Sequence, residues 1–399
     1  MRARILAATA VAALAWAATA AGSTSSLRSE LASALAGAGV SPAGTSALAV
    51  DLRSGSVVYS LNPRLAVAPA SNEKLTVAYA ALERLGRGYR FRTEVVGDGE
   101  LTGRVWQGDL YLVGFGDPSL AAAGLDALAA QVRAWGIRRV TGSVVGDESW
   151  FDRRRDVRGW KQGFLGEESP PLSALVVEHA ERWPSLEPAL EAAQRFRAAL
   201  ERRGVRVAGE PRTGRARRDG IPLAQHLSAE LHELIRFMNR ESDNFTAEML
   251  LKHLGATVGA RGSTAAGAEV VRDALAEAGV PLDGLVLADG SGLSRLDRLS
   301  AASLVALLRA AERDPDQRDA FLGSLAVAGV DGTLERRLAR RPTYGRVIAK
   351  TGTTSLASSL SGFVRGRYAF AILHSGRPVP TWTARAAQDR FVTVLARAS

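Results

Sequence analysis

Three short motifs, far apart in the chain, hold the residue types needed for acyl transfer through a serine. They read Ser71-Asn72-Glu73-Lys74, Ser242-Asp243-Asn244 and Lys350-Thr351-Gly352-Thr353. A serine hydroxyl is a poor nucleophile at neutral pH, so a base must take its proton and donors must stabilise the oxyanion that forms. Lysine can be that base when burial or a nearby cation lowers the pKa of its amine, whereas arginine cannot. Only four of the 51 basic residues are lysines, and two of the four lie in these motifs.

The first motif is expected to stand at the start of a helix. Apolar residues recur at helical intervals from Leu75 until Gly86 ends the segment. Ser71 and Lys74 would then lie one turn apart on the same side, so that the amine can reach the hydroxyl. The helix amino terminus would add its field and a backbone NH that points at the reacting carbonyl. The alternative is a helix-capping serine followed by a surface lysine.

The second motif supplies groups for proton relay and for holding the substrate. Ser242 can pass a proton between the lysine pair and the leaving nitrogen. Asn244 has both a donor and an acceptor, with which it can hold the substrate amide and Lys74. The competing interpretation is a turn or a helix cap, because Ser, Asp and Asn all favour those places.

The third motif is expected on an edge strand beside the nucleophile. There Lys350 would supply positive charge, and Thr351 and Thr353 could bond a terminal carboxylate. Gly352 would let the backbone approach a ligand closely. The NH of Thr353 is a natural second donor to the oxyanion. The alternative is an ordinary strand that ends in a glycine turn.

The amino terminus indicates export. Arg2 and Arg4 precede an uncharged, alanine-rich run from Ile5 to Ser26, and Ala18-Thr19-Ala20 has the small-x-small pattern of a signal peptidase site. We expect residues 1–22 to be a signal peptide and the mature protein to act in the periplasm or extracytoplasmic envelope of a bacterium. An uncleaved membrane anchor is the alternative, although the run is short for a spanning helix.

Composition excludes several classes of chemistry. The chain has no cysteine, so it has no disulfide, no thiolate nucleophile and no cysteine metal site. Its five histidines have no metal-ligand spacing, since Arg236 stands where a zinc-protease helix that begins at His232 would need its second histidine. We therefore expect neither a metal nor another cofactor.

The formal net charge of +10 is spread along the chain as scattered arginines. A solvated arginine-rich surface is the simplest interpretation. For an exported protein it would also favour peripheral contact with a membrane face or an anionic cell-wall polymer. No interleaved aromatic residues suggest binding to nucleic acid.

The length of 399 residues suits two domains. From about Tyr89 to Pro211 the pattern changes to short alternating stretches, which we interpret as an inserted domain over residues 89–214. Residues 23–88 and 215–399 would form the catalytic domain. Strands are predicted at 92–96, 109–113, 140–145, 346–350, 359–364 and 368–374, with two more within 46–62. Helices are predicted at 27–39, 125–135, 188–202 and 381–396, and another helical pattern resumes at Leu227 and runs on through 238–254.

The motif set is the signature of penicillin-binding proteins and class A β-lactamases. Further segments make the chain similar to the low-molecular-mass class C penicillin-binding proteins, the D-alanyl-D-alanine carboxypeptidase/endopeptidase family: Met238 to Glu248, Gly116-Asp117-Pro118, Asp289 to Arg295, and Asp331 to Leu334. The resemblance implies an α/β (α+β) fold of the penicillin-binding/β-lactamase-like transpeptidase type, with an antiparallel sheet flanked by helices. It also implies a smaller inserted α+β domain.

The spacing of the motifs departs from the family. Their serines are 242 − 71 = 171 positions apart, shorter than is usual, so we expect the family's third nested domain to be missing or reduced. By resemblance, Asp147 would bind the free amino group of a peptidoglycan side chain and Arg295 would lie near its carboxylate. The alternatives are a turn residue and a structural ion pair.

The resemblance implies a serine-type D-Ala-D-Ala carboxypeptidase that cleaves peptidoglycan stem peptides through an acyl-Ser71 intermediate and is acylated by β-lactam antibiotics. D,D-endopeptidase action would use the same chemistry. Two alternatives are a serine β-lactamase or esterase on the same scaffold, and an inactive envelope-binding module. No extra carboxylate base of the class A type is evident. A transpeptidase is disfavoured but open.

Overall fold

The computed structural model describes residues 26–178 and 186–399. The expected signal segment, residues 1–22, lies outside these ranges. The chain forms two compact units. One comprises the residues up to Asn72, Arg298–Arg309 and Ala326–Ser399, and the other comprises Glu73–Asp297 and Ala310–Leu325.

The first unit is built on a six-stranded sheet in the order β10-β11-β12-β13-β1-β2, in which every neighbouring pair is antiparallel. Its strands are β1 Thr45–Asp51, β2 Val57–Leu61, β10 Ala326–Val327, β11 Val347–Thr353, β12 Ala357–Val364 and β13 Tyr368–Ser375. Every residue of β12 is buried. A central strand with both faces covered needs helices on the sheet.

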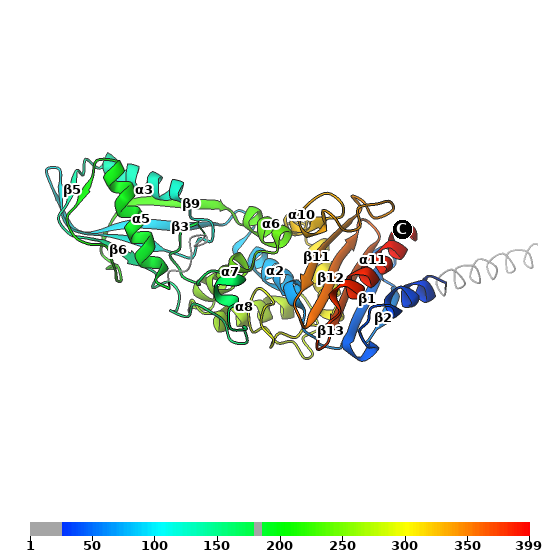
Figure 1. Cartoon of the computed structure of the whole chain (residues 1–399). Helices are drawn as coiled ribbons and strands as arrows, with labels where there is room; N and C mark the ends of the chain where they lie inside the picture. Colours follow the sequence, from blue (N-terminus) through cyan, green and yellow to red (C-terminus); the bar gives the residue numbers. More distant parts are fainter. Residues whose placement is uncertain (1–25, 179–185) are drawn as a thin grey trace, which may run out of the picture. The chain divides into compact units, whose positions relative to one another are not determined.

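Two helices of the first unit supply that cover on one face. They are the helix at 26–36 and α11, Thr381–Arg397, and Figure 1 shows both beside strands β1, β12 and β13. Leu31 and Leu35 from the first helix join Phe391 and Leu395 from α11 in one apolar core with the sheet. The unit also contains η1 Pro42–Gly44, η4 Gly332–Leu334, most of η2 Ala70–Glu73 and the start of α9 Ala301–Arg313.

The second unit holds a seven-stranded sheet and two groups of helices. The main path is β7-β5-β4-β3-β9, and β6 pairs with β4 and β8 in parallel. The strands are β3 Arg90–Thr102, β4 Val105–Gly114, β5 Arg139–Val140, β6 Val144–Asp147, β7 Arg206–Val207, β8 Arg212–Thr213 and β9 Ile221–Glu230. Helices α3, Ala122–Ala134, and α5, Pro188–Arg202, share an apolar core with this sheet (Figure 1).

Among the other helices of the second unit, α2 Lys74–Leu85 and α7 Asn244–Thr257 carry residues of the first two motifs. The rest are α4 Phe164–Glu167, α6 Leu231–Glu241, α8 Thr264–Glu277 and α10 Arg318–Ser324. Leu250, Leu251 and Leu254 on α7 are buried, as their spacing predicts.

The antiparallel sheet with helices confirms the predicted fold class. Most predicted elements are present, and α5 has the predicted bounds. Three predictions need correction. Leu227 lies in β9 and begins no helix. The helix expected through 238–254 is two helices, α6 and α7, that break at Ser242 and Asp243. The strand expected at 140–145 is divided between β5 and β6.

Strand β9 pairs antiparallel with β3, so the sheet of the second unit continues past residue 214. The division into domains at 89–214 stays a prediction. No helix in the described ranges is long and apolar enough to cross a bilayer.

Candidate active site

Ser71 lies in a 3₁₀ turn, η2, which leads directly into α2. The expected helix start is therefore present, although its first turn is 3₁₀ and the α-helix begins at Lys74. Ser71 is half-buried. Ala70, just before it, has φ +48, a left-handed conformation that costs a residue with a Cβ about 1 kcal/mol or more. Such strain at the residue before a candidate nucleophile fits a backbone held in place by its surroundings.

The third motif supplies part of those surroundings in the first unit. The side-chain NH₂ of Asn72 donates to the Lys350 carbonyl at 3.0 Å. Ser359 Oγ on β12 donates to the Pro69 carbonyl at 2.6 Å. These bonds fix the turn that carries Ser71 against strands β11 and β12.

Gly352 explains how closely strand β11 approaches the backbone of Pro69 and Ser71. A Cβ placed on it would lie 2.9 Å from the Ser71 amide nitrogen and 3.0 Å from the Pro69 carbonyl oxygen, and would overlap Ser359 Oγ. Real Cβ contacts are longer, so only glycine fits here without displacing the strand. The predicted close approach is therefore present, and it is made toward the backbone of the candidate nucleophile.

The third motif was expected on an edge strand, but β11 is not the edge strand of its sheet. β11 has a neighbour on both sides, but β10 is only two residues long and pairs with Ile348 and Ala349. The stretch from Lys350 to Thr353 therefore extends beyond β10 and pairs only with β12. Lys350 is fully buried and donates to the Thr351 carbonyl at 2.9 Å, whereas Thr353 is exposed.

In the second unit, Lys74 is fully buried at the start of α2. Its Nζ donates to Asn244 Oδ1 at 2.8 Å and to the Ser291 carbonyl at 2.7 Å. The contact between Asn244 and Lys74 is the one expected from the sequence. A neutral amine has two N–H bonds and one lone pair. These two acceptors orient the amine, and in its neutral form the lone pair is the site that can take a proton.

Burial lowers the pKa of Lys74 to about 8. Nearby carboxylates oppose this effect by smaller amounts: Asp289, Asp243, Glu248 and Glu168. The desolvation cost of the ammonium form outweighs their attraction. A buried lysine in this range can serve as a base near neutral pH, whereas an exposed lysine stays protonated.

The loop at 289–294 presents the carbonyl that holds Lys74. Glu248 Oε1, from α7, accepts the amides of Gly290 and Ser291 at 3.0 and 2.8 Å. The Asp289 carboxylate accepts the amides of Gly292 and Ser294 at 2.7 and 2.6 Å. Two buried carboxyl groups thus fix the backbone of this loop, and with it the position of the Ser291 carbonyl.

Four buried acidic residues gather in this part of the second unit: Glu73, Glu248, Asp289 and Asp297. Burial, followed by the charge of Asp289, raises the pKa of Glu248 to about 8 and the pKa values of Glu73 and Asp297 well above their ordinary range. Like charges in a dry site repel, which favours the protonated forms of Glu73, Glu248 and Asp297. Nothing in the short motifs indicated this cluster, because Glu248 and Asp297 reach it only through tertiary folding.

The second motif forms the junction between α6 and α7. Ser242 ends α6 in a left-handed conformation with φ +62, and Asp243 caps α7 by accepting the Thr246 amide at 2.7 Å. Asn244 is the first residue of α7, and its NH₂ donates to the Glu168 carbonyl at 2.8 Å. The turn and cap geometry expected as an alternative is therefore present, and it directs the Asn244 amide at Lys74.

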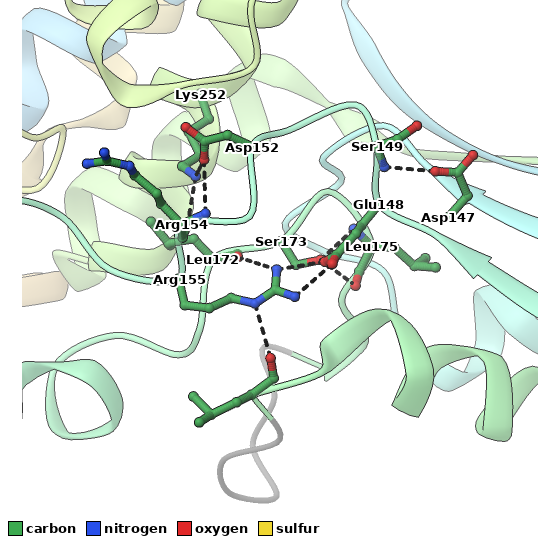
Figure 2. A network of polar contacts seen from close by, with 11 residues as sticks. Asp147, Glu148, Ser149, Asp152, Arg154, Arg155, Leu172, Ser173, Leu175 and Lys252 are labelled. Carbon is green, nitrogen blue, oxygen red and sulfur yellow. Dashed lines mark hydrogen bonds and ion pairs between the residues drawn. The ribbon is translucent and has the colours of Figure 1, made fainter. Parts of the chain in front are cut away.

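Asp147 is placed at the end of β6, where Figure 2 shows its carboxylate beside Ser149. One of its oxygens accepts the Ser149 amide and the other accepts the Ala216 amide, each at 2.8 Å. Asp147 is only 2% exposed. This is the geometry of a turn residue after a strand, and contact with a substrate amine stays a prediction. Arg295 is exposed, and its amide donates to the Gly159 carbonyl.

The segment after Asp147 is tied down by two ion pairs (Figure 2). Arg155 binds both carboxylate oxygens of Glu148, at 2.6 and 2.7 Å. Lys252, fully buried on α7, donates to Asp152 Oδ1 at 2.5 Å. Thus three of the four lysines are fully buried, Lys74, Lys252 and Lys350, while Lys161 is half-buried.

Comparison with known proteins identifies the family. The model of the D-Ala-D-Ala carboxypeptidase 3 (S13) family matches residues 27–187 and 178–398. The chain is a member of the S13 family. A D-alanyl-D-alanine carboxypeptidase of Actinomadura sp. (strain R39) is 34% identical over 438 residues, which cover 87% of this chain and 80% of that relative.

Solved structures confirm that the S13 chain has the penicillin-binding fold. Penicillin-binding protein 4 (dacB) from Haemophilus influenzae aligns with a TM-score of 0.81 at 23% identity, over 93% of this chain and 98% of that one. Its complex with a novel β-lactam aligns with a TM-score of 0.77 at the same identity and coverage. The family model matches the chain in two stretches that meet at residues 178–187.

Proposed function

We propose that this S13 protein is a serine-type D-Ala-D-Ala carboxypeptidase that acts on peptidoglycan stem peptides. The observation that carries the proposal is the environment of Lys74. Its amine is buried three residues after Ser71, its pKa is lowered to about 8, and two acceptors orient it. Family membership and the named relative support the same activity.

In the proposed reaction, Ser71 Oγ attacks the carbonyl of the penultimate D-Ala while Lys74 takes the hydroxyl proton. The NH groups of Ser71 and Thr353 would stabilise the oxyanion. Ser242 then relays a proton to the leaving nitrogen, and the C–N bond breaks to release the terminal D-Ala. Water attacks the acyl-Ser71 ester and releases the shortened peptide. Lys350 would add positive charge, and Thr351 and Thr353 would bond the terminal carboxylate.

Several further properties belong to this proposal. β-Lactams would acylate Ser71, since a β-lactam carbonyl can take the place of the scissile amide. D,D-endopeptidase action on cross-links would break the same type of bond. The protein would be exported to the envelope, where its substrate lies. The two-part family match supports a third nested domain that is missing or reduced.

For the peptide side chain, we propose Arg295 as the carboxylate contact and Asp147 as the amine contact. An acid and an arginine together suit a residue that bears both an amine and a carboxylate, such as diaminopimelate. Both carboxylate oxygens of Asp147 already accept backbone amides, so a substrate amine would share this carboxylate with them.

The test follows intact mass against time after the mature protein is mixed with excess benzylpenicillin, alongside release of D-Ala from a pentapeptide. We expect a lasting adduct on Ser71, D-Ala release, and neither of these in Ser71→Ala. An adduct that hydrolyses rapidly would favour a β-lactamase. Absence of both adduct and turnover would favour an inactive envelope-binding module.

A further inference from the structure

Arg385 stands next to the exposed end of the third motif, within the first unit. It lies on α11, its side chain is exposed, and its Nη2 donates to Thr353 Oγ1 at 2.8 Å. An arginine carries five N–H donors in a planar fork, so this bond leaves most of its donors for other acceptors.

The neighbouring acid does not neutralise Arg385. Asp389, one turn further along α11, accepts from Arg337 at 2.7 Å. In the ranges that the structure describes, no carboxylate lies within ion-pair distance of Arg385. Burial and the charge of Arg337 outweigh Asp389 and lower the pKa of Arg385 from its ordinary value, although a guanidinium stays protonated at neutral pH. Because Asp389 is bound to Arg337, the guanidinium of Arg385 leaves a positive charge beside Thr353, at the end of β11.

The step along β11 from Gly352 to Thr353 matches the length of one terminal amino acid of a peptide. Gly352 lies against the Ser71 amide, and Thr353 is the next residue. In a dipeptide, the last carboxylate carbon is about one residue length, about 3.8 Å, from the scissile carbonyl carbon. A carbonyl held at Ser71 would therefore place the terminal carboxylate about one residue along the strand, at Thr353.

We propose that Arg385 binds the terminal carboxylate of the peptide substrate, with Thr353 Oγ1 held between the guanidinium and the ligand. The proposal rests on the proposed carboxypeptidase function and deepens it, because it names the residue that recognises a free peptide end. Charge-assisted bonds from a guanidinium to a carboxylate combine strength with directional preference.

The test compares a peptide that ends in D-Ala-D-Ala with the same peptide as its carboxy-terminal amide, by kcat/KM. We expect Arg385→Ala to lose roughly ten- to hundredfold on the free acid and to stay within about twofold on the amide. Arg385→Lys should recover part of the loss, because it restores the charge without the fork. Arg397→Ala, an exposed arginine at the end of the same helix, is the matched control and should leave both substrates unchanged.

The outcomes separate this inference from the proposed function. If the unsubstituted protein neither releases D-Ala nor forms a penicillin adduct, the proposed function fails. If it does both, and Arg385→Ala keeps full activity on the free acid, the inference alone is wrong. Equal losses on acid and amide would also overturn it, since they would show that Arg385 does not recognise the carboxylate. Thermal melting of each variant verifies that it is folded.

Discussion

Substitutions of Asn244, which accepts a hydrogen bond from Lys74, should shift the pKa of Lys74 in directions that can be predicted. Asn244 Oδ1 lies 2.8 Å from Lys74 Nζ. Asn244→Asp keeps the shape and puts a negative charge at that distance, which favours the ammonium form. Asn244→Ala removes an acceptor without adding charge, which favours the neutral amine. The two substitutions should therefore move the pKa of Lys74 in opposite directions.

The size of the shift follows from the distance. At 2.8 Å, Coulomb's law gives about 1.5 kcal/mol at the dielectric constant of water and about 6 kcal/mol at an effective value of about 20. These limits correspond to roughly one to four pKa units. In the unsubstituted protein, a pKa of about 8 leaves roughly a tenth of the amine neutral at pH 7. Asn244→Asp should lower that fraction, and the acylation rate with it, by about tenfold or more.

The assay is the rate of acylation by benzylpenicillin from pH 6 to 10. For the unsubstituted protein, the rate should rise with pH, with an inflection at about 8, and level off at higher pH. The inflection should move to higher pH in Asn244→Asp, whose deficit shrinks in alkaline solution, and to lower pH in Asn244→Ala. If both variants lose the same factor at every pH with the inflection unmoved, Asn244 acts on the substrate and the argument through Lys74 is refuted.

Three other predictions concern packing and pH. Gly352→Ala should reduce acylation by tenfold or more and destabilise the fold by about 1–3 kcal/mol, because the new methyl displaces β11. In the same acylation and melting assays, Gly323→Ala in helix α10, whose new methyl meets no neighbouring atom, should leave acylation unchanged and should not lower the stability. Asp152→Asn should cost about 1–3 kcal/mol in urea unfolding, since Lys252 then loses its charge partner, and adding Lys252→Met should recover part of that loss. Burial lowers the pKa of His253 to about 4, so between pH 6.5 and 4 this side chain gains its proton only in the unfolded chain. Its contribution to the free energy of unfolding should therefore fall by about 3 kcal/mol across that window, and an unchanged pH slope of unfolding in His253→Asn would contradict this.

Local sequence patterns predicted where the helices and strands of this fold lie better than they predicted where these elements break. The strands of the first unit other than the two-residue β10, and helix α5, follow from alternation and helical spacing. The break between α6 and α7 does not, because the apolar spacing continues across it. Only the left-handed conformation of Ser242 ends the helix, and its Ser-Asp-Asn sequence favours such a turn without requiring one. Leu227 was wrongly assigned to a helix because the polar residues around it are compatible with a half-exposed strand as well as with the start of a helix.

For the candidate site, the sequence predicted one contact of Lys74 and missed the groups that hold its other acceptor. Asn244 was expected to hold Lys74, and it does. Glu248 and the Ser291 carbonyl were not expected, because a carboxyl that fixes a loop 42 positions away leaves no local pattern. Arg385 was likewise one arginine among many until α11 was seen to place it beside Thr353.

The burial of the lysines has a practical consequence. Lys74, Lys252 and Lys350 are fully buried, so a succinimidyl ester, which needs an accessible amine, can reach Lys161 but none of these three in the folded protein. A fluorophore introduced this way would attach at one side chain, beside the Phe164 ring, without engineering and without touching the amines of the motifs. Because arginine takes the place of lysine on its surface, the natural protein offers amine reagents very few side chains to modify.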